Sequence, residues 1–217
     1  PRLVDIQHGQ IRLIAGLDLA AAAETQRLRL FRAEGYAMRP RVARLGVLVV
    51  FCAAHVLAGP VVVLPTAPTA VEKSAAAELT DGLRRATGLD VQMVVEGDAP
   101  SDAVRLYVGA TKAATAALGE VEWKSDEICI RPVADGLILT GHPQRGAIYA
   151  VDTLLEDHFG VRWWTSTEST YPRAAFSLPN KETRFAPPFR YRETYYLDAL
   201  DPRFKVRLKG NFTSRTK

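Results

Sequence analysis

The segment from Gly141 to Trp164 most constrains the fold, because it has the pattern of a strand end, a helix and an aromatic exit in immediate succession. Pro143 suits the first turn of a helix, and Gly160 suits the residue that ends one. Between them, apolar residues recur at three- and four-residue steps and so share one helical face: Ile148, Val151, Leu155 and Phe159. The segment therefore predicts an amphipathic helix over 143–159 that packs against a sheet.

A second helix is predicted by signals at both of its ends. Thr69 and Glu72 have the spacing of a capping box, in which each side chain binds the free backbone N–H of the other residue. Gly88 suits the left-handed position that ends a helix. The apolar residues between these ends lie on one face: Val71, Ala75, Leu79, Leu83 and Ala86. We therefore expect a helix over about 71–86.

Short apolar runs between turn residues predict the strands. These runs are 61–64, 91–95, 104–108, 127–131 and 137–140, and a short helix over 112–118 follows the third. Asp135-Gly136 tolerates a tight turn and predicts a hairpin between the last two strands. The resulting order, βαββαββα, predicts an α+β fold, a mixed sheet whose amphipathic helices need to cover only one face. Cys129, within this hairpin, is expected to be a buried thiol without a disulfide.

The amino-terminal part has a different pattern, which predicts export. Residues 38–58 join an arginine-rich segment to an apolar run of the length of a signal-peptide core, with cleavage after Ala58. The run is shorter than the roughly 20 residues that cross a bilayer. Retention as a membrane anchor, or burial within the fold, stays open. Residues 1–37 are expected to be a non-native or disordered upstream extension, and the predicted location is periplasmic, cell-surface or extracellular, with a membrane partner only if the leader is uncleaved.

The net charge of +4 does not indicate a nucleic-acid partner, because the basic excess lies at the two ends of the chain. Residues 45–202 hold 14 Lys and Arg against 20 Asp and Glu. An acidic central region is not expected to bind a polyanion. The scattered histidines lack metal-ligand spacing, and no glycine-rich phosphate motif is present, so neither a metal nor a cofactor is predicted.

Several short motifs occur in a characteristic order over about residues 60–165. They are Val62-Val-Leu-Pro65, Ala75-Ala-Ala-Glu-Leu79, Thr87-Gly88, Tyr107-Val-Gly109, Asp135-Gly136, Arg145-Gly146 and Gly160-Val-Arg-Trp163. This order resembles the small α/β domain before the catalytic barrel in glycoside hydrolases of the family 67 (α-glucuronidase) and family 20 (β-hexosaminidase) type. The resemblance implies a non-catalytic accessory domain over 59–165, a linker over 166–188, and the start of a truncated catalytic barrel over 189–217.

The segment after this linker is similar to the first barrel strand of the hexosaminidase type, at Pro188-Phe-Arg-Tyr-Arg192. Alternation of polar and aromatic residues over 189–197 also predicts a strand. The resemblance implies that Arg192 contacts the sugar in the reactive subsite. The match departs at Glu193, where the family has glycine, and a structural arginine on a strand stays an alternative.

Glu193 is itself a candidate sugar contact beside Arg192, and three other residues are further candidates. Trp163 and Trp164 offer a stacking platform, or they pack against a neighbouring barrel. Arg145, near the helix start, offers a guanidinium to a ligand, although Gly146 beside it also suits simple close packing. No catalytic residue is assigned, because glycoside cleavage needs two carboxylates about 5–10 Å apart, and adjacent carboxylates on a helix, as at 156 and 157, point in different directions.

The sequence thus predicts an accessory domain of an exported carbohydrate-active enzyme, truncated before its catalytic residues and inactive alone. It would meet carbohydrate through the missing barrel, on which it would pack. Two alternatives stay open. One is a membrane-anchored structural domain without a sugar ligand, and the other is a stand-alone carbohydrate-binding module whose stacking surface is Trp163, Trp164, Tyr171 and Tyr191.

Overall fold

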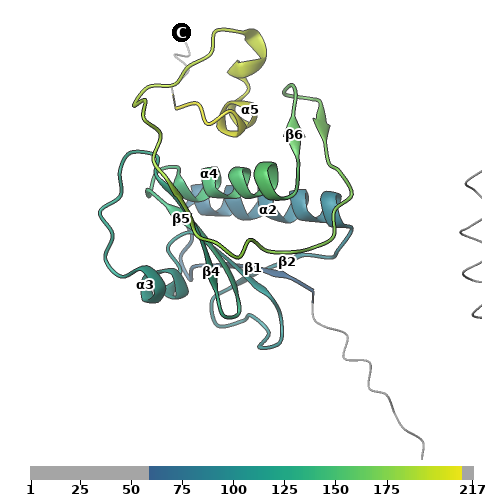
Figure 1. The fold of residues 1–217 in the computed structure, drawn as a ribbon, viewed down its shortest axis with the longest axis vertical. Coiled ribbons are helices and arrows are strands. Elements are labelled where there is room, and N and C mark those ends of the chain that lie inside the picture. Colours follow the sequence, from purple (N-terminus) through teal and green to yellow (C-terminus); the bar gives the residue numbers. More distant parts are fainter. Residues whose placement is uncertain (1–58, 212–217) are drawn as a thin grey trace, which may run out of the picture. The chain divides into compact units, whose positions relative to one another are not determined.

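The computed structural model describes residues 59–211, so the predicted extension 1–37 and leader 38–58 lie outside the described residues. Six strands form one sheet in the order β2-β1-β3-β5-β4-β8 (Figure 1). The strands are β1 Val61–Leu64, β2 Gln92–Val95, β3 Arg105–Val108, β4 Ile128–Val133, β5 Gly136–Gly141 and β8 Thr183–Phe185. β1, β2, β3 and β5 run parallel, whereas β4 is antiparallel to β5 and β8. The prediction of a mixed α+β sheet is confirmed.

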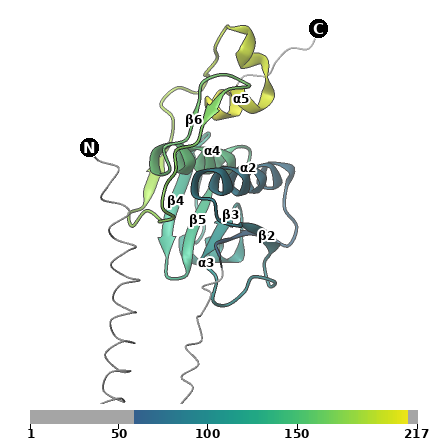
Figure 2. The same ribbon diagram turned by 90° about the vertical axis from the view of Figure 1, so that its right-hand side faces the viewer.

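Two helices, α2 (Ala70–Thr87) and α4 (Gly146–Thr153), lie side by side on one face of the sheet (Figures 1 and 2). The predicted capping box opens α2, with Glu72 Oε2 accepting from the Thr69 backbone N–H at 2.8 Å. Gly88 ends α2 in the left-handed conformation, with φ of 77°. Gly82 lets α2 pack closely against the segment that follows α4, because an added Cβ would lie 2.6 Å from Leu155 Cδ1.

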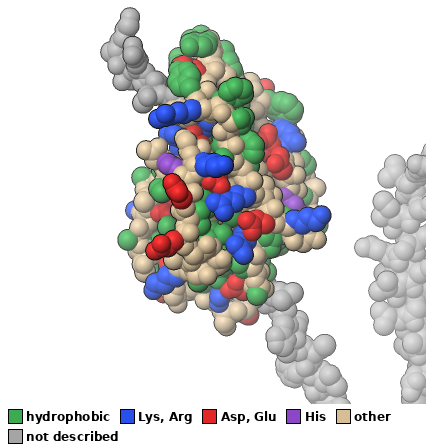
Figure 3. All heavy atoms as spheres, turned by 60° about the vertical axis from the view of Figure 1, so that its left-hand side comes forward, with side chains coloured by type: hydrophobic (Ala, Val, Ile, Leu, Met, Phe, Trp, Pro, Cys, Tyr) green, Lys and Arg blue, Asp and Glu red, His purple; other side chains and the backbone are tan. Residues whose placement is uncertain are grey.

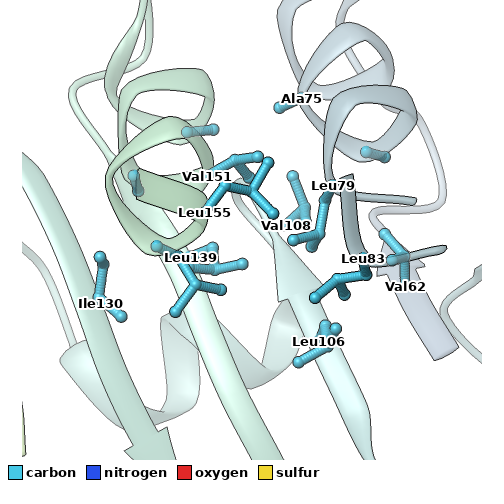
Figure 4. Close-up of a cluster of buried hydrophobic side chains, with 14 of the residues drawn as sticks. Val62, Ala75, Leu79, Leu83, Leu106, Val108, Ile130, Leu139, Val151 and Leu155 are labelled. Atoms are coloured by element: carbon cyan, nitrogen blue, oxygen red, sulfur yellow. The ribbon is translucent and has the colours of Figure 1, made fainter. Parts of the chain in front are cut away.

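The main core lies between these two helices and the sheet (Figure 4). Its labelled residues come from both helical segments and four strands: Val62, Ala75, Leu79, Leu83, Leu106, Val108, Ile130, Leu139, Val151 and Leu155. The third helix, α3 (Lys112–Leu118), packs on the opposite face, where Val61 and Val63 join Ala114 in a smaller cluster. The expectation that helices cover only one face is therefore wrong, because α3 covers part of the second face. This agrees with β1, where alternate residues point to opposite sides and every residue is buried.

The helix that the sequence placed at 143–159 begins later, at Gly146, because residues 143–145 form a turn. α4 then continues into a π-helical turn, Leu154–His158. Gly160 ends the segment in the left-handed conformation, as predicted, with φ of 71°. The predicted apolar face packs on the main core as expected.

The predicted hairpin joins β4 and β5, but its two loop residues are Ala134 and Asp135, since Val133 pairs with Gly136. Gly136 is required for a different reason. It lies opposite Arg105 of β3, and an added Cβ would lie 1.8 Å from the Arg105 carbonyl oxygen. The glycine therefore permits close approach of two strands.

The carboxyl-terminal part departs most from the sequence prediction. Two strands lie within the predicted linker 166–188. One is β7 (Ser169–Thr170), which pairs with β6 (Arg162–Trp163) just before the linker, and the other is β8, which extends the main sheet. The predicted strand over 189–197 is wrong, because that segment is irregular and leads into a 3-10 turn, Leu197–Leu200, and a short helix, α5 (Pro202–Arg207).

The reason lies in the hydrogen bonds of this segment's backbone. Arg192 donates its backbone N–H to Asn211 Oδ1 at 2.9 Å, and the Asn211 backbone N–H donates to the Arg192 carbonyl at 3.2 Å. Asn211, 19 residues beyond Arg192 in the chain, thus holds this segment in place, and no neighbouring strand of the described structure does. We call residues 186–211 the strap.

Candidate functional site

Two of the predicted sugar contacts, Arg145 and Arg192, converge on a carboxylate that the sequence analysis did not single out, Asp126. Arg145 Nε donates to Asp126 Oδ1 and Arg192 Nη2 donates to Asp126 Oδ2, both at 2.8 Å. Asn211 Nδ2 adds a hydrogen bond to Oδ2 at 3.0 Å. Asp126 is 0% exposed. We call these four residues the Asp126 cluster, in which one buried anion is shared by two arginines.

The backbone and the hydrogen bonds of Asp126 both suit this role. Its φ of 55° lies in the left-handed region, which Asp adopts more readily than most residues. Burial alone would raise the pKa of Asp126, but hydrogen bonds from Arg145, Arg192 and Asn211 outweigh burial and hold this pKa below its usual range. Asp126 is therefore ionised at neutral pH.

Arg192 binds the strap as well as Asp126. Its Nε donates to the Lys209 carbonyl and its Nη1 donates to the Phe189 carbonyl, each at 2.8 Å. Tyr149 of α4, beneath its guanidinium, donates its hydroxyl proton to the Gly210 carbonyl at 2.8 Å, and burial raises the pKa of Tyr149 to about 12. In this geometry Arg192 acts as a structural arginine, and its contact with sugar stays a prediction.

The two predicted tryptophans differ in their surroundings. Trp163 is 9% exposed, and the Arg207 guanidinium lies 5.1 Å from its ring centroid. Trp164 is 61% exposed, and its Nε1 donates to Thr170 Oγ1 at 2.9 Å. Tyr171 is covered by the Arg85 guanidinium, 3.7 Å from the ring centroid. Two rings of the proposed stacking surface are therefore covered by arginines, which leaves Trp164 as its exposed tryptophan.

Glu193 lies in the strap, where its carboxylate accepts a hydrogen bond from the Tyr191 hydroxyl. Both residues line a cleft of about 270 Å³, together with Phe189 and Thr194. Phe189 and Tyr191 belong to a set of exposed aromatic and aliphatic side chains in the strap. Figure 3 shows hydrophobic side chains gathered at the top of the view, the end of the described residues that carries the strap. Acidic and basic side chains are interspersed below them.

A second buried carboxylate, Glu78 of α2, binds the helix of the strap. Arg203 donates to Glu78 Oε2 from Nε at 2.8 Å and Nη2 at 2.6 Å, and Arg207 donates to Oε1 from Nε at 3.0 Å and Nη2 at 2.7 Å. Phe204, between these arginines in sequence, is buried in the main core. The strap is thus anchored at two carboxylates, Asp126 and Glu78, and charge-assisted pairs of this kind are among the stronger hydrogen bonds.

A cavity of about 490 Å³ lies between α2, α4 and α5, lined in part by Asp152 and Glu78. Asp152 is fully buried, and neither of its carboxyl oxygens has a hydrogen-bond partner among residues 59–211. Burial, aided by the negative charge of Glu78, raises the pKa of Asp152 to about 8. Both carboxyl groups are buried, so this arrangement does not present an acid pair to a glycoside.

The described part of the chain contains no group of three or more His, Cys, Asp or Glu side chains placed to hold a metal ion. Cys129 is a buried free thiol, as predicted. Among residues 59–211, no helix combines the length and the apolar character needed to cross a membrane.

The fold, the Asp126 cluster and the ion pairs of Glu78 define an open α+β domain with a carboxyl-terminal strap held by buried carboxylates. Known protein families and curated proteins contain no match to the sequence. Similar solved structures include BtGH115A, a GH115 4-O-methyl-α-glucuronidase with specificity for decorated arabinogalactans, at 18% identity and a TM-score of 0.47 over 62% of this chain. Another is a GH138 enzyme targeting pectin rhamnogalacturonan II, at 16% identity and a TM-score of 0.40 over 61% of this chain.

The matched part spans 18% of the first of these proteins and 12% of the second. Both are glycoside hydrolases, of families other than the 67 and 20 types that the motifs resemble. At these scores neither structure assigns a family or a function to this chain, and the specific families stay a prediction.

Proposed function

We propose that residues 59–165 are the non-catalytic accessory domain of an exported carbohydrate-active protein, and that the strap holds the chain that follows it in a fixed position. The observation that carries the proposal is the Asp126 cluster. It uses the guanidinium groups of Arg145 and Arg192 to bind polypeptide, where a sugar site would direct them to solvent. The carbohydrate part of the proposal comes from the motif resemblance.

The two anchors explain how such a domain positions a neighbour. Movement of the strap would take Arg203 and Arg207 away from the buried Glu78 carboxylate, or take Arg192 away from Asp126, which would keep only Arg145. Breaking a buried pair in this way costs about 3–5 kcal/mol. A segment anchored at both sites therefore keeps one orientation, which is the property required of a docking platform for a second domain.

Hydrolysis assays test the non-catalytic role. The 217-residue chain should release no p-nitrophenol from glycosides of glucose, xylose, galactose, N-acetylglucosamine or glucuronic acid. The product of a reading frame extended past Lys217 should hydrolyse one of them, because it would supply the two carboxylates that the chemistry needs. Turnover by the 217-residue chain would overturn the proposal. An extended product without turnover would contradict the part of the proposal that places a catalytic domain after this chain.

Export is tested by mass spectrometry of the protein recovered outside the cytoplasm. The expected amino terminus is Gly59, after cleavage behind Ala58. A soluble cytoplasmic product that retains Met38 would contradict export.

The stand-alone carbohydrate-binding module remains the second candidate, favoured by the exposed rings of Trp164 and Tyr191. In affinity electrophoresis through gels that contain a polysaccharide, this candidate predicts retardation that Trp164→Ala abolishes. Equal mobility of the parent and the variant in every gel would exclude a role for this tryptophan.

A further inference from the structure

A pocket of about 390 Å³ lies at the β8 edge of the sheet, between β8, the end of α4 and the strap. We call it the edge pocket, and its principal lining residues are Tyr149, Thr153, Asp157, Arg184, Phe185 and Lys209. Its volume is in the range of small-molecule sites, which combine an apolar wall with a few placed polar groups. None of the sugar contacts predicted from the sequence lines it.

One wall comes from three residues at four-residue steps, Tyr149, Thr153 and Asp157, so that a single helical side faces the pocket. The π-helical turn Leu154–His158 lies within this wall, and such turns occur frequently at functional sites. Thr153 is 8% exposed, and its Oγ1 has no hydrogen-bond partner among residues 59–211. A buried hydroxyl without a partner is unusual. The Oγ1 atom itself is closed to solvent, so a ligand reaches it only after the Thr153 side chain rotates.

Asp157, one helical turn further on, is exposed and forms no hydrogen bond or ion pair with the residues that the structure describes. Its carboxylate is therefore available as an acceptor. Facing it across the pocket is β8, where the Phe185 ring is 52% exposed. The pocket thus combines an open aromatic ring, an unpartnered hydroxyl and an available carboxylate.

The two cations that line the pocket are already paired. Arg184 Nε donates to Glu127 Oε1 at 2.6 Å, and Lys209 Nζ donates to Glu156 Oε2 at 2.9 Å. Because both cations are already paired with carboxylates and Asp157 adds a further carboxyl group to the wall, the pocket does not favour a phosphate or another anion. Its chemistry fits a neutral ring that carries hydroxyl groups on its edge and C–H groups on its face.

From these contacts we propose that the edge pocket binds one pyranose unit of a neutral saccharide, with its face on Phe185 and its hydroxyls on Asp157. The choice of a saccharide among polyhydroxylated ligands rests on the proposed function. Asp126 also borders the pocket, but both of its oxygens accept hydrogen bonds within the Asp126 cluster, so the ligand contacts come from the other residues. The domain then contacts glycan by itself and not only through a barrel.

The test is an NMR chemical-shift titration of the ¹⁵N-labelled 217-residue chain. The probes are the methyl glycosides of glucose, xylose, galactose and N-acetylglucosamine, with methyl glucuronoside and inorganic phosphate as charged probes. At least one neutral glycoside should bind. Phe185→Ala removes the aromatic contact, and Asp157→Asn removes the charge-assisted hydrogen bond. Each variant should therefore weaken this binding by roughly tenfold. Phe189→Ala, which removes an exposed ring from the neighbouring cleft, is the matched control and should leave the Kd unchanged.

Three results would overturn the proposal. They are no binding of any neutral glycoside at tens of millimolar, tighter binding of glucuronoside or phosphate than of the neutral probes, and binding that is lost in Phe189→Ala but kept in Phe185→Ala. None of these results affects the accessory role, which the hydrolysis assays judge separately. Turnover by the 217-residue chain would conversely refute that role and leave the binding measurement intact.

Discussion

Replacement of Asp152 by asparagine should make the protein less sensitive to pH between pH 5 and pH 7. Burial and the negative charge of Glu78 raise the pKa of Asp152 to about 8, while Arg207 and Lys209 act in the opposite direction and Glu156 adds to the rise. The side chain is therefore protonated in the folded protein at pH 7. In the unfolded chain its pKa returns to about 3.9, so that it is ionised there.

The sign and size of the effect follow from proton linkage. Between about pH 4 and pH 8 the folded state holds one proton more at Asp152 than the unfolded state, so the free energy of unfolding falls as pH rises. Each pH unit in this window contributes about 1.4 kcal/mol, which gives about 2.7 kcal/mol between pH 5 and pH 7. Asp152→Asn has no proton to lose and should not show this contribution.

Urea unfolding of the parent and of Asp152→Asn at pH 5, 6 and 7 measures this difference. The stability of the variant relative to the parent should increase by about 2.7 kcal/mol across the series. Asp157→Asn, which changes an exposed carboxylate on the same helical segment, is the control and should keep a constant offset. Among the described residues, three carboxyls have a lowered pKa, Asp126, Glu127 and Asp135. They are present in both proteins, so any pH dependence that they add cancels in the difference between the variant and the parent. Parallel stability curves for Asp152→Asn and the parent would refute the reasoning.

Two further substitutions test the anchors and the sheet. Asp126→Ala leaves two partly buried arginines without their shared partner, so it should lower the free energy of unfolding by about 3 kcal/mol and speed proteolysis within the strap. Thermal unfolding and timed digestion followed by mass spectrometry measure both effects, and a variant that matches the parent in each would remove Asp126 as an anchor. Gly136→Ala should destabilise the protein by about 3 kcal/mol or more, because the new Cβ would overlap the Arg105 carbonyl. Unchanged urea unfolding in this variant would show that the two strands separate easily.

Local signals predicted most of the helices and strands of residues 59–165. The capping box of Thr69 and Glu72 depends on groups only three residues apart, and the left-handed ends at Gly88 and Gly160 depend on the backbone freedom of single residues. Apolar periodicity likewise located the face of α2 that is buried. Where a local signal was misplaced, as at Pro143, a hydrogen-bonded turn displaced the helix start to Gly146.

The strap shows why a local pattern alone was insufficient. The alternation over 189–197 is typical of a strand, but a strand also needs a partner, and no neighbouring strand pairs with this segment in the described structure. Conversely, Thr183–Phe185 lies in a segment without a sustained pattern and becomes the sixth strand because β4 offers it a free edge.

The candidate site shows the same contrast between what local sequence signals predict and what tertiary packing decides. The sequence by itself determined the residue types, and it singled out Arg145 and Arg192 as arginines in notable positions. Only the tertiary structure brought them to one carboxylate, because Asp126 is 19 residues from Arg145 and 66 from Arg192 along the chain. Helix caps and turns depend on neighbours in sequence, whereas a buried ion cluster depends on how whole elements pack. The packing of β4, α4 and the strap, which no single segment encodes, therefore decided which charges are shared and which side chains remain open to a ligand.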